Sequence, residues 1–172
     1  MRRLLALCLL LLASAPARAI ELAPPSGEAL PALRFLDMQG NETGLDAFRG
    51  KAVVLNLWAT WCAPCREEMP SLRALAARLD PEKAVVLALS VDRAGQDRVQ
   101  RFIDEIGGAG AMQVYRDPKA AAARSLKVPG LPATILVDAQ GQEAGRLLGI
   151  ADWDSPAAVE AVRKVETSGK PQ

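Results

Sequence analysis

Two dense apolar stretches stand out in the hydrophobic pattern of this chain. Residues 52–58 (AVVLNLW) and 84–91 (AVVLALSV) are short and apolar on both faces, which is typical of buried central strands. Between them, residues 62–79 carry apolar side chains at helical spacing. The pattern continues unbroken on both sides of Pro70, so we expect a kink there and not a break. A strand, a helix and a second strand in this order indicate an α/β fold.

The rest of the chain continues the alternation of short strands and helices. We expect a hairpin around residues 39–41, further strands at 112–115, 133–137 and 144–148, and further helices at 96–106, 119–126 and about 155–165. Ser155 is a suitable N-cap for the last helix, and Asp117-Pro118 opens the one before it. The chain contains no internal repeats. These elements predict an α/β sandwich with a mixed central sheet.

The first nineteen residues have the pattern of an export signal. Residues 1–3 (MRR) are positive, and the apolar run at 4–12 is shorter than the roughly 20 residues that a membrane span needs. Ala17 and Ala19 supply the small residues of a cleavage site. We therefore expect a cleaved signal peptide, with an uncleaved N-terminal anchor as the alternative. The expected organisation is a signal peptide at 1–19, an extended lead-in at 20–32, one domain at 33–167 and a disordered tail at 168–172.

Removal of the signal changes the charge and the cysteine content. The whole chain has a net charge of +1, but without the three arginines of the signal its 21 basic residues fall to 18 against 20 acidic ones, a net charge of −2. This balance argues against nucleic acid as a partner, because nucleic-acid-binding domains carry clustered basic surface. Loss of Cys8 leaves Cys62 and Cys65 as the only thiols. A disulfide between residues so close in sequence constrains the unfolded chain little, which favours a reactive role.

The segment 58–66 (WATWCAPCR) places this pair where a buried strand ends and the long helix begins. Backbone N–H groups and the positive end of the helix dipole stabilise a thiolate at that position. Cys65 follows three residues later on the same helical face, close enough to form a disulfide. We therefore expect Cys62 to be the exposed attacking sulfur and Cys65 the buried resolving one. An inert disulfide is the structural alternative. A zinc site would need two more ligands, whereas the chain has no histidine.

The segment 53–70 (VVLNLWATWCAPCREEMP) resembles the active-site signature of the thioredoxin superfamily, and most closely that of its TlpA-like branch of exported thiol–disulfide oxidoreductases. The resemblance covers nearly all of residues 33–165 and includes a second signature, VPGLPAT, at 128–134. It implies a thioredoxin-like three-layer sandwich with a mixed central β-sheet. The length of the chain between Asp92 and Pro132 implies the helix–strand insertion of the TlpA-like branch.

This resemblance implies a periplasmic enzyme that reduces disulfides in exported proteins by dithiol exchange, as in cytochrome c maturation. Apocytochrome c and copper-site proteins are the implied kinds of substrate, and a membrane thiol transporter is the implied electron donor. It implies no metal and no cofactor apart from the Cys62–Cys65 disulfide, and we expect a monomer. An oxidase or isomerase direction stays open. The alternatives on the same fold are a copper-binding metallochaperone, since two thiolates suit Cu(I), and a peroxidase of the peroxiredoxin type. Peroxiredoxins carry Pro and Thr where this chain has Leu55 and Ala59.

Two acidic neighbours and one amide bear on how the dithiol loses its protons. Thioredoxins carry a buried aspartate six residues before the first cysteine, where this chain has Asn56, which cannot exchange a proton. On a helix Glu68 lies about 60° from Cys65, whereas Glu67 lies about 160° away and should face water. We expect Glu68 to border the dithiol, where TlpA-like proteins place an active-site glutamate; stabilisation of the first helical turns is the alternative.

The remaining expected site residues concern substrate binding. The resemblance implies a cis peptide bond before Pro132, facing the dithiol, with the backbone of the preceding residue pairing with the substrate chain. Trp61 offers an apolar contact surface beside Cys62, and Trp58 is expected in the core. The expected substrate-binding residues are Trp61, Ala63, Pro64, Leu131 and Pro132.

Overall fold

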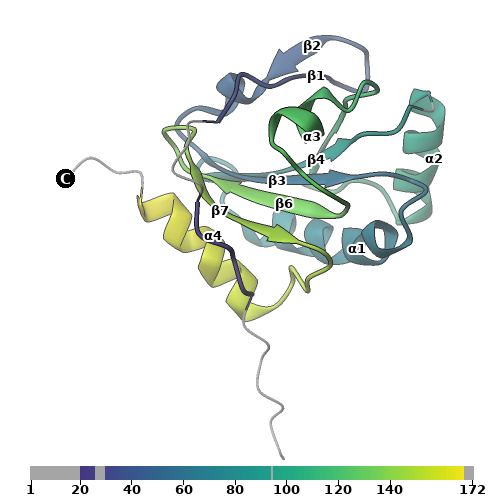
Figure 1. Cartoon of the computed structure of the whole chain (residues 1–172). Coiled ribbons are helices and arrows are strands. Elements are labelled where there is room, and N and C mark those ends of the chain that lie inside the picture. Colours follow the sequence, from purple (N-terminus) through teal and green to yellow (C-terminus); the bar gives the residue numbers. More distant parts are fainter. Residues whose placement is uncertain (1–19, 26–29, 94, 169–172) are drawn as a thin grey trace, which may run out of the picture.

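A mixed β-sheet forms the centre of the molecule (Figure 1). The computed structural model describes residues 20–25, 30–93 and 95–168, in which the strand order is β2-β1-β5-β4-β3-β6-β7. Strands β3, β4 and β5 are parallel, and all other neighbouring pairs are antiparallel. The strands are β1 (Arg34–Leu36), β2 (Glu42–Gly44), β3 (Ala52–Trp58), β4 (Ala84–Ser90), β5 (Gln113–Arg116), β6 (Ala133–Val137) and β7 (Glu143–Leu148). The expected mixed sheet is thereby confirmed.

Helices cover both faces of this sheet. In Figure 1, α1 (Ala63–Arg78) and α4 (Pro156–Ser168) lie on one face and α3 (Ala121–Ser125) lies on the other. Helix α2 (Gln96–Glu105) lies beside the start of α1, where Arg66 of α1 forms an ion pair with Glu105 at 3.3 Å. A short 3-10 helix (Leu45–Phe48) follows β2. The architecture is the expected three-layer sandwich, with α2 and β5 inserted after β4.

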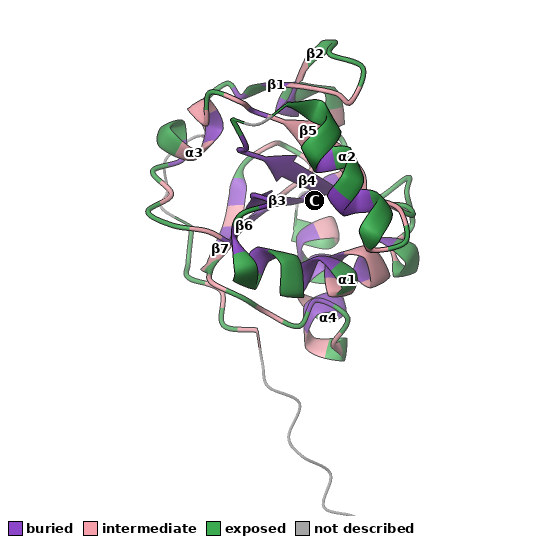
Figure 2. Ribbon diagram, turned by 90° about the vertical axis from the view of Figure 1, so that its right-hand side faces the viewer, coloured by how far each residue is buried: buried purple, intermediate pink, exposed green. Residues whose placement is uncertain are grey.

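The core is centred on β3 and β4. Every residue of both strands is buried, and Figure 2 shows these strands surrounded by the buried sides of the helices. Met69, Leu72 and Leu75 form the buried face of α1. Trp58 is fully buried at the end of β3, as expected, and packs against Phe102 of α2. The segment that carries the cysteine pair thus follows directly from a fully buried strand.

Several elements differ from their predicted bounds. The helix predicted at 119–126 is shorter, because Ala120 has a left-handed backbone (φ 49°) and the helix begins only at Ala121. The carboxylate of Asp117 then accepts a hydrogen bond from Ala122 N at 2.7 Å. Strand β5 lies one residue later than predicted, and α4 continues to Ser168 after its predicted N-cap, Ser155, whose Oγ accepts from Ala158 N at 3.2 Å. Helix α1 runs through Pro70 without a break.

The lead-in at 20–32 is packed onto the domain where it is described. Ala23 forms an antiparallel bridge with Arg146 of β7, with backbone hydrogen bonds of 2.8 and 3.1 Å. Ile20, Leu22 and Leu30 pack against the core. The expected signal peptide and residues 169–172 of the expected tail lie outside the described residues. Within the described part, no helix has the length and hydropathy needed to cross a membrane.

Candidate active site

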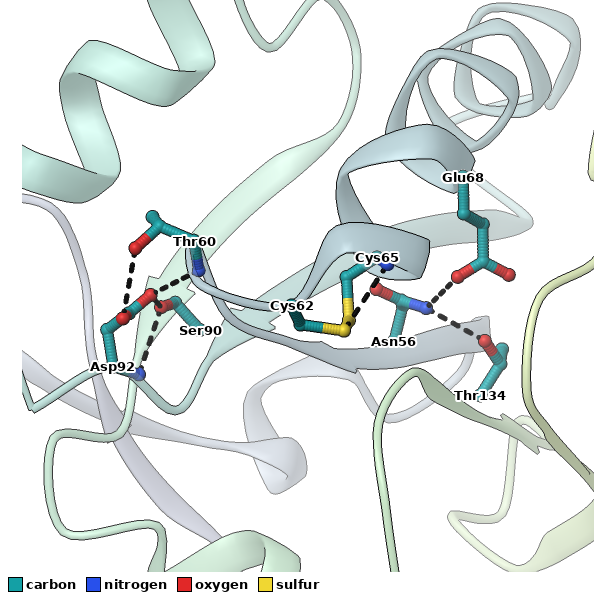
Figure 3. The surroundings of a disulfide bond; sticks show 8 residues. All are labelled: Asn56, Thr60, Cys62, Cys65, Glu68, Ser90, Asp92 and Thr134. Atoms are coloured by element: carbon teal, nitrogen blue, oxygen red, sulfur yellow. Dashed lines mark hydrogen bonds between the residues drawn. A yellow bond between two sulfur atoms is a disulfide. The ribbon is translucent and has the colours of Figure 1, made fainter.

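Cys62 and Cys65 form a disulfide at the start of α1 (Figure 3). Cys62 is the N-cap of the helix, and its Sγ accepts a hydrogen bond from Cys65 N at 3.3 Å. Pro64, with its fixed φ and missing N–H, suits the first turn in which it lies. The sulfur of Cys62 therefore faces the unpaired N–H groups at the positive end of the helix.

The two sulfurs differ in exposure less than the sequence predicts. Cys62 is 6% exposed and Cys65 is 1% exposed. Cys65 is the buried partner as expected, and Cys62 is the more accessible, but the prediction of an exposed Cys62 is wrong for the disulfide form. The cause is local: its Sγ is bonded to Cys65 and turned in over the first turn of α1.

Glu68 is buried one turn further along α1, with 1% of its surface exposed. Its Oε1 accepts hydrogen bonds from Trp153 Nε1 and, at 3.2 Å, from Ala151 N. Its Oε2 accepts from Asn56 Nδ2 at 3.3 Å. Burial raises the pKa of Glu68 from 4.5 to about 7, although these hydrogen bonds act in the opposite direction. A carboxyl with such a pKa can take up or release a proton near neutral pH.

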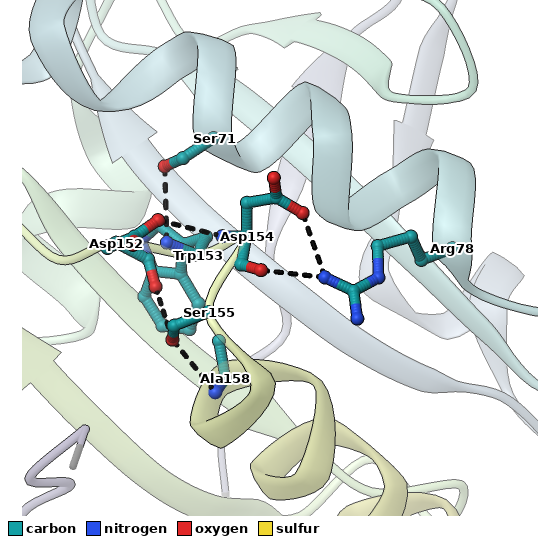
Figure 4. Close-up of polar contacts among 7 residues, drawn as sticks. All are labelled: Ser71, Arg78, Asp152, Trp153, Asp154, Ser155 and Ala158. Atoms are coloured by element: carbon teal, nitrogen blue, oxygen red, sulfur yellow. Dashed lines mark hydrogen bonds and ion pairs between the residues drawn. The ribbon is translucent and has the colours of Figure 1, made fainter. Parts of the chain in front are cut away.

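The loop before α4, drawn in Figure 4, carries Trp153, whose Nε1 donates to Glu68. Ser71 Oγ of α1 accepts a hydrogen bond from Trp153 N at 3.2 Å. The guanidinium of Arg78 binds Asp154 at its backbone oxygen (2.6 Å) and its carboxylate (2.9 Å). These contacts attach the loop to α1 at the backbone of Trp153 and at the residue that follows it. The indole is therefore fixed in position by the same helix that carries Glu68.

Asn56 links β3, β6 and Glu68. It is fully buried and lies opposite Thr134 in the antiparallel pairing of β3 and β6. Its Nδ2 donates to Thr134 Oγ1 at 2.9 Å as well as to Glu68. Figure 3 shows the side chain between Cys65 and Glu68. As expected, Glu68 lies on the side of α1 that carries the dithiol, and Glu67 is exposed.

A second buried carboxylate, Asp92, lies beyond the other end of the dithiol, as Figure 3 shows. Its oxygens accept hydrogen bonds from Thr60 N (2.7 Å), Thr60 Oγ1 (3.1 Å) and Ser90 Oγ (3.1 Å). Thr60 lies two residues before Cys62, so Asp92 fixes the segment that carries the attacking sulfur. Asp92 was not among the site residues predicted from the sequence. The available signal was a lone acidic residue directly after a buried parallel strand.

We expect Asp92→Ala to lower the free energy of unfolding by about 3 kcal/mol, because it leaves the donors of Thr60 and Ser90 buried without an acceptor. Denaturant unfolding of the oxidised protein measures this change. Asp97→Ala, which removes an exposed carboxylate from α2, is the control and should change the value by less than about 0.5 kcal/mol. A loss below about 1 kcal/mol for Asp92→Ala would show that the network does not stabilise this loop.

A groove of about 540 Å³ runs beside the dithiol, and both Trp61 and Leu131 line it. Trp61 is 67% exposed, and Ala63 and Pro64 are exposed next to it. The peptide bond between Leu131 and Pro132 is cis, as the resemblance implied. Strand β6 begins opposite Leu57, so Pro132 lies beside the end of β3 from which the Cys62 loop leaves. The five expected substrate-binding residues are thus gathered around the carboxyl end of the central strand β3.

Arg66, directly after Cys65, has partners on another helix. The guanidinium of Arg66 lies 4.7 Å from the ring centre of Phe102 and pairs with Glu105, both on α2. The contacts given for this side chain are thus with α2 and not with the sulfurs. In the described part of the chain, no group of three or more Cys, His, Asp or Glu side chains is arranged to hold a metal ion.

Comparisons with known proteins agree with this geometry. A model of the AhpC/TSA family matches residues 26–142. The thiol-disulfide oxidoreductase ResA of Geobacillus kaustophilus (strain HTA426) is 32% identical over 118 residues, which are 67% of this chain and 65% of that protein. The chain thus spans just under two thirds of the length of this relative.

Solved structures show the same fold. A thiol:disulfide interchange protein from Bacteroides sp. has a TM-score of 0.68 at 25% identity, over 87% of this chain and 94% of that one. The thioredoxin domain of a thiol-disulfide oxidoreductase from Bacteroides vulgatus has a TM-score of 0.67 at 24% identity, over 85% of this chain and 98% of that one. The thioredoxin-like fold is therefore established for this chain.

Proposed function

Because the chain belongs to the AhpC/TSA family of thioredoxin-like proteins, we propose that it is a thiol–disulfide oxidoreductase that reduces disulfide bonds in exported proteins. The observation that carries the proposal is the Cys62–Cys65 pair at the N-terminus of α1. The relatives named as thiol-disulfide oxidoreductases support exchange chemistry. The reducing direction is supported by the resemblance to the TlpA-like branch.

The proposed reaction has two exchange steps. The Cys62 thiolate, favoured by the helix N-terminus, attacks one sulfur of the substrate disulfide, and the other substrate sulfur leaves as a thiolate. Cys65 then loses its proton and attacks Cys62 Sγ, which forms the Cys62–Cys65 disulfide and releases the second substrate thiolate. Two electrons pass from the dithiol to the substrate. Glu68, which borders a cavity of about 730 Å³, is the proposed acceptor of the Cys65 proton.

The proposed setting is the periplasm. The signal-like residues 1–19 support export, and a membrane thiol transporter would keep the dithiol reduced in that oxidising compartment. Apocytochrome c and copper-site proteins are the proposed kinds of substrate. The groove beside Trp61 and Leu131 is where a substrate chain would lie, next to the backbone that precedes Pro132.

The reduction potential tests the direction of the reaction. We expect a value near that of thioredoxin, about −270 mV, measured by equilibration with glutathione buffers. A value near about −120 mV, typical of strong disulfide oxidants, would contradict a reductase. Turnover of hydrogen peroxide by the reduced protein would instead favour a peroxidase.

Trp61→Ala is expected to raise KM for a protein substrate about tenfold, because an aromatic side chain in the centre of a contact surface contributes on the order of 1–2 kcal/mol. The value of kcat should change little. The rate with oxidised glutathione, which is too small to cover the groove, should change less than about twofold.

The control for this change is Leu148→Ala, which removes an apolar side chain that is 53% exposed outside the groove. It should leave KM for the protein substrate unchanged. Both variants should unfold within about 0.5 kcal/mol of the unmodified protein. Equal KM values for Trp61→Ala and the unmodified protein would remove Trp61 from substrate binding.

A further inference from the structure

A buried hydrogen-bond acceptor beside the dithiol has no partner in the oxidised protein. Oδ1 of Asn56 is inaccessible to solvent and accepts no hydrogen bond from any described residue. Nδ2 of the same amide is fully used, since it donates both to Glu68 Oε2 and to Thr134 Oγ1. These two contacts determine which way the amide faces. Figure 3 shows Nδ2 turned toward Glu68 and Thr134, and Oδ1 turned toward Cys65.

A buried carbonyl without a donor is unfavourable, and such groups are rare in folded proteins. A donor for Asn56 Oδ1 arises when the Cys62–Cys65 disulfide is opened. Reduction breaks the S–S bond and adds two electrons and two protons, supplied by a dithiol or two monothiols that become a disulfide. One proton stays on Cys65 Sγ, which is 1% exposed and lies on the buried face of α1. A thiol is a weak hydrogen-bond donor, and it has no access to water here.

We propose that Asn56 is a positioning residue that accepts a hydrogen bond from the Cys65 thiol in the reduced protein. This bond exists in the dithiol form and is absent in the disulfide form. It therefore shifts the redox equilibrium toward the dithiol form. The inference rests on the proposed function only in requiring that the pair cycles between the two forms.

The same bond gives the two sulfurs different protonation. A hydrogen bond donated by a thiol stabilises its neutral form, so Cys65 keeps its proton. Cys62 Sγ instead accepts from Cys65 N at the N-terminus of α1, an arrangement that stabilises the thiolate. Cys62 is thereby ready to attack, and Cys65 is held neutral until its proton is removed. Asn56 also donates to Glu68, so it connects the thiol to the proposed proton acceptor.

The S–H stretching band of Cys65 in the infrared tests the proposal. In the full chain, the difference between Cys62→Ser and Cys62→Ser/Cys65→Ser isolates this band. We expect it at the lowered frequency of a hydrogen-bonded thiol. Asn56→Leu, which has a similar volume and no acceptor, should move the band to the frequency of a free thiol. Asn56→Asp, which keeps an oxygen there, should preserve the lowered frequency.

A free-thiol frequency with Asn56 present would overturn the proposal, and this measurement stays decisive even if Asn56→Leu does not fold. An unmoved band in folded Asn56→Leu would overturn it as well.

Equilibration with glutathione gives a second readout. Asn56→Leu should shift the equilibrium toward the disulfide by about three- to tenfold, which corresponds to roughly 15–30 mV for a two-electron couple. Thr134→Val is the control, because it removes one acceptor of Nδ2 and leaves Oδ1 in place; its shift should stay below about twofold. A shift in Asn56→Leu with an unmoved S–H band would assign the effect to packing and overturn the proposal. Neither the infrared measurement nor the glutathione equilibrium uses a protein substrate. A failure of the proposed reductase function can therefore be distinguished from a failure of the hydrogen bond between Cys65 and Asn56.

Discussion

Replacement of Cys62 by serine is expected to lower the rate of protein-disulfide reduction by more than about 10³-fold, because the hydroxyl is not ionised at neutral pH and cannot attack a disulfide. Replacement of Cys65 by serine should stop the reaction one step later. Attack by Cys62 still occurs, but no thiol remains to resolve the mixed disulfide with the substrate. The measurement is substrate-thiol release with a chromogenic thiol reagent, together with non-reducing electrophoresis of the products.

The control for both variants is Cys8→Ser, tested in the full chain because Cys8 lies in the expected signal peptide; it should leave the rate unchanged. Retention of more than about a tenth of the rate in Cys62→Ser would contradict the assignment of the nucleophile. The same Cys65→Ser variant, expressed in cells and isolated with its covalently bound partner, would identify the physiological substrate. Recovery of apocytochrome c or a copper-site protein is the expected outcome.

Glu68→Gln is expected to slow resolution of the mixed disulfide about 10²-fold at about pH 8, because the glutamine cannot accept the proton of Cys65. The pKa of Glu68 is raised to about 7. The rate in the unmodified protein should therefore increase as Glu68 ionises near pH 7, and this increase should be absent in the variant. Rapid-mixing measurements of resolution across this pH range show the difference.

The same substitution should change how stability depends on pH. In the folded protein the pKa of Glu68 is about 7, whereas its ordinary value is 4.5. Between these values the folded state binds more protons than the unfolded state, so the free energy of unfolding falls as pH rises from about 4.5 to about 7. The difference amounts to about 3 kcal/mol, and it should disappear in Glu68→Gln.

The matched control is Glu67→Gln, at the exposed neighbouring position. It should keep both the pH-dependent rate and the pH-dependent stability of the unmodified protein. A Glu68→Gln variant with the same two profiles would show that Glu68 only stabilises α1.

The buried strands and the dithiol could be predicted because their signals are local. Residues 52–58 and 84–90 are apolar on both faces, and no surface position in the fold suits such a segment. The start of α1 follows from the strand before it and the helical spacing after it. Helix α3 was predicted too long because an alanine-rich segment shows no contrast between faces, and its start depends on the backbone of Ala120.

The surroundings of the dithiol could not be predicted in full, because they depend on contacts between residues that are far apart in the sequence. Trp153 donates a hydrogen bond to Glu68, which lies 85 positions earlier in the chain. The hydrophobic periodicity of a sequence predicts helices and strands but not a contact of this kind. Asp92 reaches back 32 positions to Thr60. The low exposure of Cys62 has a local cause, the closed disulfide with Cys65, and the sequence does not specify this redox state. The angle of Glu68 on α1 could be predicted, but its partners and its raised pKa could not.

The bridge between Ala23 and Arg146 has a consequence for the outer side of the sheet. Strand β7 is the last in the strand order, and such a strand presents free N–H and C=O groups to any extended chain that approaches it. The two hydrogen bonds of Ala23 occupy the outer side of β7 near its middle. A recombinant domain begun at residue 33 would lack this cover, and its sheet would be open to strand-to-strand self-association.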